Sequence, residues 1–136
     1  MRVGEYVVLA GGSLYLPYGE PLPKVDVLVL LTWRLYSIGE KCEAQGIRFI
    51  HHGVRDYGTP RRKPWLALLD RIIQELKAGE EVAIYCGGGH GRTGMLLGSL
   101  IAVLEPEMDP AQAVRERYCF EAIENPRQEA FVRSIR

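Results

Sequence analysis

The chain has 136 residues, 47% of them hydrophobic, and this size and composition predict a single domain over residues 1–136 with one core. Its 17 basic and 17 acidic residues leave a formal net charge of zero, so no long-range positive field attracts nucleic acid or an anionic membrane. The first residues lack a signal-peptide pattern and no apolar run could span a membrane, so we expect a cytoplasmic protein with neither membrane nor nucleic acid as a partner.

The opening of the chain predicts a β-hairpin at the edge of a sheet. Residues 4–9 alternate loosely between polar and apolar side chains, and a glycine pair follows shortly afterwards. Gly11 and Gly12 suit a tight turn, because glycine adopts positive φ angles without steric cost. We therefore expect these glycines to turn the chain into a second strand over residues 13–16.

The next segments predict two parallel strands joined by a helix. Residues 25–31 are apolar on both faces, which is typical of a central strand that is covered on both sides. Residues 35–44 can form a short helix that ends before Gly46, and residues 47–52 return as a strand. A strand, a helix and a second strand in this order indicate parallel pairing.

A polar loop and a longer helix follow. Residues 53–63 show no apolar periodicity and carry charged residues, glycine and proline, so we expect a loop of the kind that often carries function. Residues 64–78 place apolar side chains at helical spacing, and Gly79 marks the end of this helix. Its apolar face should pack on the sheet.

A strand over residues 82–85 leads through a glycine-rich turn into a buried helix over residues 93–104. The turn begins at Cys86 and continues through Gly87, Gly88, Gly89, His90 and Gly91. So many glycines allow the backbone to direct its N–H groups inward, and the helix start adds its dipole, so the turn predicts a substrate oxyanion site. Arg92 adds a planar charged group that matches two phosphate oxygens, and Thr93 can donate a hydrogen bond to sulfur. These surroundings favour the nucleophilic thiolate of Cys86.

Two helices that begin at proline end the chain. Asp109 and Asn125 each precede a proline, an arrangement typical of a helix N-cap and the first helical position. We expect these helices over residues 110–118 and 126–136. The buried face of the second is predicted to contain Ala130, Phe131 and Ile135.

The order of Cys86, five further residues, Arg92, Thr93 and Gly94 resembles the signature loop of the cysteine-dependent protein tyrosine phosphatases. It is most similar to their small dual-specificity branch, of archaeal and bacterial type. The lysine of a nucleotide-binding P-loop is absent, which argues against that alternative. Together with the strand and helix order, the resemblance implies an α/β three-layer sandwich: a central, mixed but mainly parallel sheet of about five strands, flanked by helices.

The resemblance also implies a two-step hydrolysis without a metal or other cofactor. Cys86 would attack phosphorus while the loop amides and Arg92 stabilise the phosphate oxygens. The expected substrates are phosphoproteins that carry phosphotyrosine and also phosphoserine or phosphothreonine. We expect the protein to act as a monomer.

A phosphate ester's leaving oxygen needs a general acid, and the chain has four aspartates. Asp26 belongs to a strand pattern, Asp70 faces outward on a helix, and Asp109 precedes a helix. Asp56 is the best candidate, because it lies in the polar loop after a strand. Residues 54–60 resemble the acid loop of the same phosphatases. The alternative is a solvated aspartate that makes a local turn.

Residues 124–131 resemble the family's C-terminal segment, in which a glutamine helps to place the water that attacks the thiophosphate. Gln128 takes this catalytic role by position, although an exposed amide on a helix surface remains the alternative. The chain departs from the family at Tyr85, where histidine is usual. His90 lies at the expected pocket rim, either as a neutral histidine or, when protonated, as a contact to a second substrate phosphate.

The remaining cysteines and histidines match no zinc-binding spacing, so no metal site is predicted. These residues are His51, His52, Cys42 and Cys119. Three cysteines at irregular spacing also argue against a disulfide framework, although either of the other two could form a redox disulfide with Cys86.

Two alternatives to a protein phosphatase stay open. A phosphoinositide phosphatase or an RNA 5'-triphosphatase could use the same loop, and it is favoured by His90 and by the cluster of Arg61, Arg62 and Lys63. With Arg55, this cluster flanks the acid loop and could form a basic rim around the pocket. A non-catalytic phosphate-binding module is the third possibility, and the intact set of Cys86, Arg92 and Asp56 argues against it.

Overall fold

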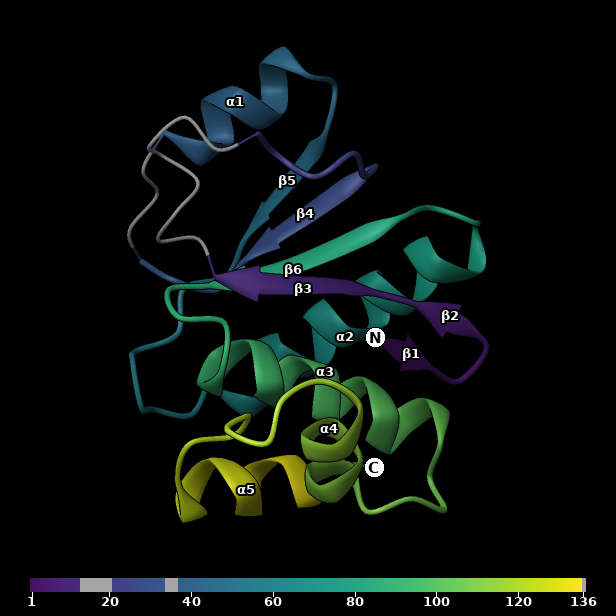
Figure 1. The fold of residues 1–136 in the computed structure, drawn as a ribbon, viewed down its shortest axis with the longest axis vertical. Helices are drawn as coiled ribbons and strands as arrows, with labels where there is room; N and C mark the ends of the chain where they lie inside the picture. The colour runs from purple at the N-terminus through teal and green to yellow at the C-terminus, as the bar shows by residue number, and fades with distance from the viewer. Residues whose placement is uncertain (13–20, 34–36, 136) are drawn as a thin grey trace.

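A four-stranded parallel sheet runs through the middle of the molecule (Figure 1). The structure is a computed structural model, and it describes residues 1–12, 21–33 and 37–135. The strands lie in the order β3, β6, β4, β5. Their bounds are Leu9–Gly12 for β3, Val27–Leu30 for β4, Arg48–His51 for β5 and Val82–Cys86 for β6.

The two central strands, β4 and β6, are apolar and buried. Every residue of β4 is buried, and Tyr85 is the one residue of β6 that keeps some exposure. Continuous apolar sequence is expected where helices cover both faces of a parallel sheet. The register places Leu30 beside Tyr85 and Gly12 beside Cys86. Three strands therefore end at the same edge of the sheet as Cys86.

Helices cover both faces of this sheet (Figure 1). The helix bounds are Ile38–Ala44 for α1, Arg62–Lys77 for α2, Gly91–Leu104 for α3, Pro110–Arg117 for α4 and Pro126–Arg133 for α5. α1 packs on one face over a small apolar cluster, whereas α2 and α3 pack on the other face over the main core. α4 and α5 pack against α3. The predicted three-layer α/β fold is confirmed.

α3 is buried along most of its length. Every residue from Gly91 to Ala102 is buried, because β6, α2, α4 and α5 surround the helix. A helix that is apolar all round is expected in such a position. A Cβ atom at Gly98 would lie 2.8 Å from Cγ1 of Val132, so α3 and α5 are in close contact. The start of α3, which carries Arg92, is thus fixed by packing on several sides.

The predicted hairpin turn at the glycine pair is wrong. The hairpin is formed by β1 (Arg2–Val3) and β2 (Tyr6–Val7), which pair in antiparallel fashion on either side of Gly4. Gly4 supplies the positive φ of this turn, at +58°. The expected strand over residues 13–16 lies outside the described residues.

Gly11 and Gly12 instead belong to β3, which pairs in parallel with β6. A Cβ atom at Gly12 would lie only 2.7 Å from the carbonyl oxygen of Gly87. A Cβ atom at Gly11 would lie 2.9 Å from the ring of Tyr85. These glycines therefore allow close packing of a strand against its neighbours, which is the other common reason for glycine in a strand.

The buried face of α5 also differs from the prediction. Gln128 and Val132 are fully buried one helical turn apart, and Ile135 is buried just beyond the helix. Ala130 is exposed and Phe131 is half-buried. The prediction followed apolar residues and therefore missed a buried amide.

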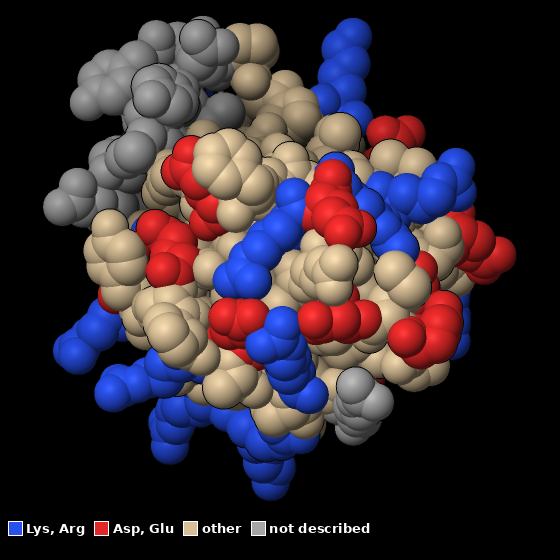
Figure 2. All heavy atoms as spheres, turned by 60° about the horizontal axis from the view of Figure 1, so that its bottom comes forward, with Lys and Arg blue, Asp and Glu red and all other residues tan. Residues whose placement is uncertain are grey.

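The surface over α4 and α5 carries mixed charge, as Figure 2 shows with acidic and basic side chains interleaved. Arg133 pairs with Asp109 at 3.0 Å and with Glu129 at 2.7 Å, and Arg115 pairs with Glu129 at 3.2 Å. This pairing agrees with a formal net charge of zero. Among the described residues, none of the helices combines the length and apolarity that a membrane crossing requires.

Candidate active site

Cys86 ends β6 and is buried, with 1% of its surface exposed. The backbone N–H of Gly89 donates a hydrogen bond to its sulfur at 3.2 Å. Gly89 has a φ of +84°, a conformation that glycine adopts at little cost. The turn therefore curls back over the sulfur, and its amide stabilises negative charge there.

The glycine-rich turn rests on β3. A Cβ atom at Gly89 would lie 2.8 Å from the carbonyl carbon of Gly11 and 2.9 Å from the nitrogen of Gly12. Tyr118 also holds the turn, because its hydroxyl donates to the carbonyl oxygen of Gly89 at 2.5 Å. Burial, reinforced by the charges of Cys86 and of other nearby groups, raises the pKa of Tyr118 to about 12. Its hydroxyl therefore stays a hydrogen-bond donor at neutral pH.

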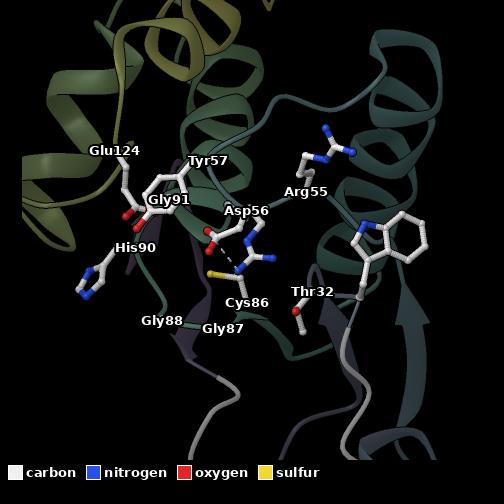
Figure 3. A pocket seen from close by; sticks show the side chains of 12 residues that line it. Thr32, Arg55, Asp56, Tyr57, Cys86, Gly87, Gly88, His90, Gly91 and Glu124 are labelled. Carbon is white, nitrogen blue, oxygen red and sulfur yellow. Dashed lines mark ion pairs between the residues drawn. The ribbon is translucent and has the colours of Figure 1, made fainter.

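Arg92 lies in the first turn of α3 and is 8% exposed. Its Nη1 donates to the carbonyl oxygen of Val54 at 3.1 Å, and its Nη2 lies 3.5 Å from Oδ1 of Asp56 (Figure 3). The side chain of Asp56 is 61% exposed, so it reaches the pocket from a surface loop. One guanidinium thus connects the loop that carries Asp56 to the turn that carries Cys86.

Thr93 follows Arg92 and is completely buried. Among the described residues, its Oγ1 is the buried side-chain polar atom that lacks a hydrogen-bond partner. A buried hydroxyl without a partner is costly, so such a group is expected to find one in a functional state. The predicted hydrogen bond from Thr93 to the thiolate would satisfy it, and this role stays a prediction.

A pocket of about 640 Å³ opens at this edge of the sheet, within the usual range of about 300–1,000 Å³ for small-ligand sites. Figure 3 shows Cys86 at its base with Asp56 above it. The lining residues are Thr32, Trp33, Arg55, Asp56, Tyr57, Cys86, Gly87, Gly88, His90, Gly91, Arg92 and Glu124. The structure therefore brings the predicted nucleophile, arginine and acid into one pocket.

Four lining residues were given no role from the sequence. Thr32 and Trp33 lie two and three residues beyond the end of β4, so the rule that ligands bind beyond the carboxyl ends of parallel strands could have found them. Tyr57 sits in the acid loop, and Glu124 lies beside Gly91, where a Cβ atom would collide with the Glu124 carboxylate. Neither has a sequence signal beyond its place in the chain.

Gln128 lies outside the pocket lining, and it is fully buried, so the exposed-amide alternative is wrong. Its Oε1 accepts from the backbone N–H of Glu124 at 2.8 Å. Its Nε2 donates to the carbonyl oxygen of Gly58 at 3.2 Å. The water-placing role of Gln128 stays a prediction.

His90 lies within the turn, and Tyr85 directly precedes Cys86. Nδ1 of His90 lies 3.3 Å from the sulfur of Cys119, which is partly exposed. Tyr85 is half-buried, and burial raises the pKa of its hydroxyl. Cys42 is buried in the cluster under α1, on the opposite face of the sheet from α3, and burial raises the pKa of its thiol.

Of the four basic residues near the acid loop, Arg55 lines the pocket. Arg62 instead donates hydrogen bonds at 2.9 Å to the hydroxyl and the carbonyl oxygen of Ser134. Across residues 1–12, 21–33 and 37–135, no cluster of three or more histidine, cysteine and acidic side chains is arranged to hold a metal ion.

Comparison with known proteins identifies similar sequences. A family model described as "Tc-R-P: Polymorphic toxin system, DSP-PTPase phosphatase" matches residues 23–104, which contain both the acid loop and the glycine-rich turn. An uncharacterized protein of Methanocaldococcus jannaschii is 40% identical over 79 residues, which cover 58% of this chain and 49% of that protein. Cyclin-dependent kinase inhibitor 3 of Rattus norvegicus is 27% identical over 95 residues, covering 65% of this chain and 45% of that protein. The chain thus spans about half the length of the curated relatives it matches.

Solved structures with the same fold include Tk-PTP in its active form, with a TM-score of 0.71 at 24% identity, covering 82% of this chain and 78% of that chain. Kinase associated phosphatase has a TM-score of 0.73 at 21% identity, covering 79% of this chain and 66% of that chain. PTPMT1 has a TM-score of 0.72 at 13% identity, covering 98% of this chain and 92% of that chain. PTPMT1 in complex with PI(5)P is also similar, with a TM-score of 0.67 at 12% identity, covering 96% of this chain and 87% of that chain.

Proposed function

The chain belongs to the DSP-PTPase family of cysteine-dependent phosphatases, and we propose that it hydrolyses phosphotyrosine, phosphoserine and phosphothreonine esters in phosphoproteins. One observation carries the proposal. Cys86, Arg92 and Asp56 line a single pocket, in which Arg92 lies 3.5 Å from the Asp56 carboxylate. A nucleophile, a phosphate-binding cation and an acid are the groups that the reaction needs.

In the first step, the thiolate of Cys86 attacks phosphorus in line with the leaving oxygen. The P–O bond to the substrate breaks as the S–P bond forms, and Asp56 gives its proton to the departing oxygen. The N–H groups of the glycine-rich turn would stabilise the phosphoryl oxygens. One of them, the N–H of Gly89, donates to the Cys86 sulfur in this structure. The product alcohol or phenol leaves, and a cysteinyl-phosphate remains.

In the second step, Asp56 is ionised and takes a proton from water, which attacks the phosphorus of the cysteinyl-phosphate. The S–P bond breaks, and inorganic phosphate and the Cys86 thiolate are released. Arg92 holds the phosphoryl group throughout, because its planar group can pair with two oxygens at once. No cofactor takes part in this proposal, since Arg92 and the turn's amides supply the positive charge.

A phosphoinositide phosphatase is the second candidate. It is favoured by Arg55, which lines the pocket and could contact an additional phosphate. The similarity to PTPMT1, which has been solved with PI(5)P, also supports it.

For the first candidate, a phosphatase of phosphoproteins, we further propose one catalytic domain over residues 1–136 that acts as a cytoplasmic monomer.

Initial rates on four substrate classes test the proposal. The classes are phosphotyrosyl peptides, phosphoseryl and phosphothreonyl peptides, phosphoinositides, and RNA with a 5'-triphosphate. We expect the highest kcat/KM on the phosphopeptides, and Cys86→Ser should hydrolyse none of the four. Faster turnover of phosphoinositide or RNA would replace the substrate class, and turnover of none would favour a phosphate-binding module.

A further inference from the structure

The acid loop is held from two sides in this structure. On one side, Arg92 donates to the carbonyl oxygen of Val54 at 3.1 Å and pairs with Asp56 at 3.5 Å. On the other side, the start of α5 supplies two donors. Nδ2 of Asn125 donates to the carbonyl oxygen of Tyr57 at 2.9 Å, and Nε2 of Gln128 donates to that of Gly58 at 3.2 Å. The two residues after the proposed acid are therefore tied to a different helix from the one that carries Arg92.

Both side-chain amides are fixed in orientation by their own backbone partners. Oδ1 of Asn125 accepts from the N–H of Gln128 at 2.9 Å and so caps α5. Oε1 of Gln128 accepts from the N–H of Glu124 at 2.8 Å. Because each amide oxygen is occupied by an N–H donor, each NH₂ group must face the acid loop. Gln128 is fully buried, which restricts its movement further.

The loop adopts an unfavourable backbone conformation between these contacts. Tyr57 has a φ of +60°, in the left-handed region that bulky residues rarely adopt. Such a conformation persists only when surrounding contacts hold it in place. The carbonyl oxygen of Tyr57 is itself the acceptor of the Asn125 bond. The hydrogen bond from Asn125 therefore holds the strained residue itself, Tyr57, which directly follows Asp56.

We propose that Asn125 and Gln128 are positioning residues that hold Asp56 over the pocket, where it can protonate the leaving oxygen. Neither residue itself lines the pocket, so they act through the acid loop that they contact. The proposal rests on the proposed role of Asp56 as general acid. It gives the buried Gln128 a task at the first chemical step, in addition to any contact with water at the second.

We call the hydrogen bonds from Asn125 to Tyr57 and from Gln128 to Gly58 the two ties. Two variants each remove one tie while preserving the local fold. Asn125→Ser keeps a good helix cap but is too short to reach Tyr57. Gln128→Met keeps the length and volume of the side chain but removes its donor and acceptor. The matched control is Val132→Ala, which removes buried apolar contacts from the same helix and leaves both ties intact. Asp56→Asn provides the reference for complete loss of the acid.

The readout is kcat for a phosphoseryl peptide, whose alkoxide leaves poorly, and for p-nitrophenyl phosphate, whose leaving group needs little protonation. Misplacement by about 1 Å can cost up to about 10²-fold, so each tie variant should lose roughly 10- to 10²-fold in kcat on the peptide. The loss on p-nitrophenyl phosphate should be much smaller. Both tie variants should also cause little further loss in an Asp56→Asn background. Val132→Ala should lower the melting temperature without any dependence on the leaving group.

The positioning role would be overturned if a tie variant lost equal kcat on both substrates. It would also be overturned if the fold-loss of the tie variant and that of Asp56→Asn multiplied in the double variant. Either result would leave the phosphatase function standing. If Asp56→Asn itself shows no dependence on the leaving group, the acid assignment falls and the positioning role with it. Circular dichroism establishes that each variant folds. If neither tie variant folds, the two bonds are structural and the proposal is overturned.

Discussion

Arg92 combines a buried charge with two separate contacts to the acid loop. Arg92 is 8% exposed, and the partners of its guanidinium are the carbonyl oxygen of Val54 and the carboxylate of Asp56. A Cβ atom at Gly87 would lie 3.1 Å from Nη2, so the glycine makes room for the guanidinium at the turn. A buried cation with this geometry is placed to receive a phosphate dianion.

Arg92→Lys should therefore damage the enzyme although it keeps the charge. Lysine offers a compact charge in place of a planar fork, so it cannot hold two phosphate oxygens and Val54 together. Removing one donor to a transition-state oxyanion typically costs about 10²- to 10³-fold, and we expect kcat/KM on p-nitrophenyl phosphate to fall at least that far. Wild-type kinetics in this variant would mean that another residue binds the phosphate.

Tyr118 makes a second prediction at the scale of one residue. Burial, with the charge of Cys86 next in importance, raises its pKa from 10.0 to about 12 in the folded protein. A raised pKa means that the neutral hydroxyl is favoured by folding. Its stabilisation is complete below pH 10 and is lost as the pH rises from 10 to about 12. Over this range, the free energy of unfolding should fall more steeply for wild type than for Tyr118→Phe, in urea titrations at each pH. Parallel pH profiles would contradict this assignment.

The sequence was most informative about residues that work together and lie close to one another along the chain. Cys86, Arg92 and the glycines between them follow one another in a turn, so their spacing alone predicts an anion site. Asp56 was recognisable because it lies in a polar loop after a strand. The burial of Gln128 and its contact with the acid loop could not be predicted, because its partners are backbone groups of Glu124 and Gly58, and Gly58 is distant in sequence.

At the scale of elements, the site depends on glycines that permit three segments to meet. β3 passes beneath the glycine-rich turn at Gly11 and Gly12, and the segment between α4 and α5 approaches α3 at Gly94. A Cβ atom at Gly94 would lie 2.9 Å from the backbone nitrogen of Ile123 and 3.0 Å from Cβ of Ala122. The carbonyl oxygen of His90 accepts from the N–H of Gly94 in the same region. The start of α3 is therefore enclosed by backbone that cannot easily move.

Gly94→Ala should destabilise the protein, because the atoms it would meet are largely backbone. Overpacking of this kind typically costs about 1–3 kcal/mol in the free energy of unfolding, which urea denaturation would measure. Gly39→Ala in α1 is the matched control, since its Cβ would meet the movable ring of Phe49 at 3.3 Å. That variant should be neutral or gain up to about 1 kcal/mol from helix propensity. Equal effects of the two substitutions would contradict the account of Gly94.

Periodicity in the sequence predicted the strands and helices that pack by their own apolar pattern, such as β4, α2 and α3. It failed for β3, because a glycine pair is equally compatible with a turn and with close packing. The distinction lies in the contact between Gly12 and Gly87, which are brought together only by the parallel pairing of β3 and β6. Local sequence does not contain this long-range information.

At the scale of the whole molecule, Glu105 joins the N-terminal hairpin to the helical layer. Its Oε2 accepts from the N–H of Gly4 at 2.8 Å and from Nη1 of Arg117 at 2.6 Å, and its Oε1 accepts from Nη2 of Arg117 at 2.9 Å. Nη1 of Arg117 also donates to the carbonyl oxygen of Arg2 at 3.3 Å. These bonds tie β1 to the ends of α3 and α4, at the opposite end of α3 from the pocket.

Glu105→Gln should lower the free energy of unfolding by about 1–3 kcal/mol at neutral pH, the usual size for hydrogen bonds to a charged group. The hydrogen bonds from Arg117 are the main cause of the lowered pKa of Glu105. A lowered pKa means that the stabilisation is present above the ordinary value of 4.5 and is lost as the pH falls below it. The difference between wild type and variant in urea denaturation should therefore shrink in acid. A constant difference across pH would refute this, and kcat should change little because the contact lies far along α3.

The central claim is that Cys86 forms a covalent bond to phosphorus during turnover. Intact-protein mass spectrometry after rapid quenching of the enzyme with excess p-nitrophenyl phosphate tests it most directly. We predict that wild-type protein gains the mass of one phosphoryl group, that peptide mapping places this group on Cys86, and that Cys86→Ser protein gains none. Full turnover by Cys86→Ser, or a phosphoryl group found on any other residue, would contradict the claim.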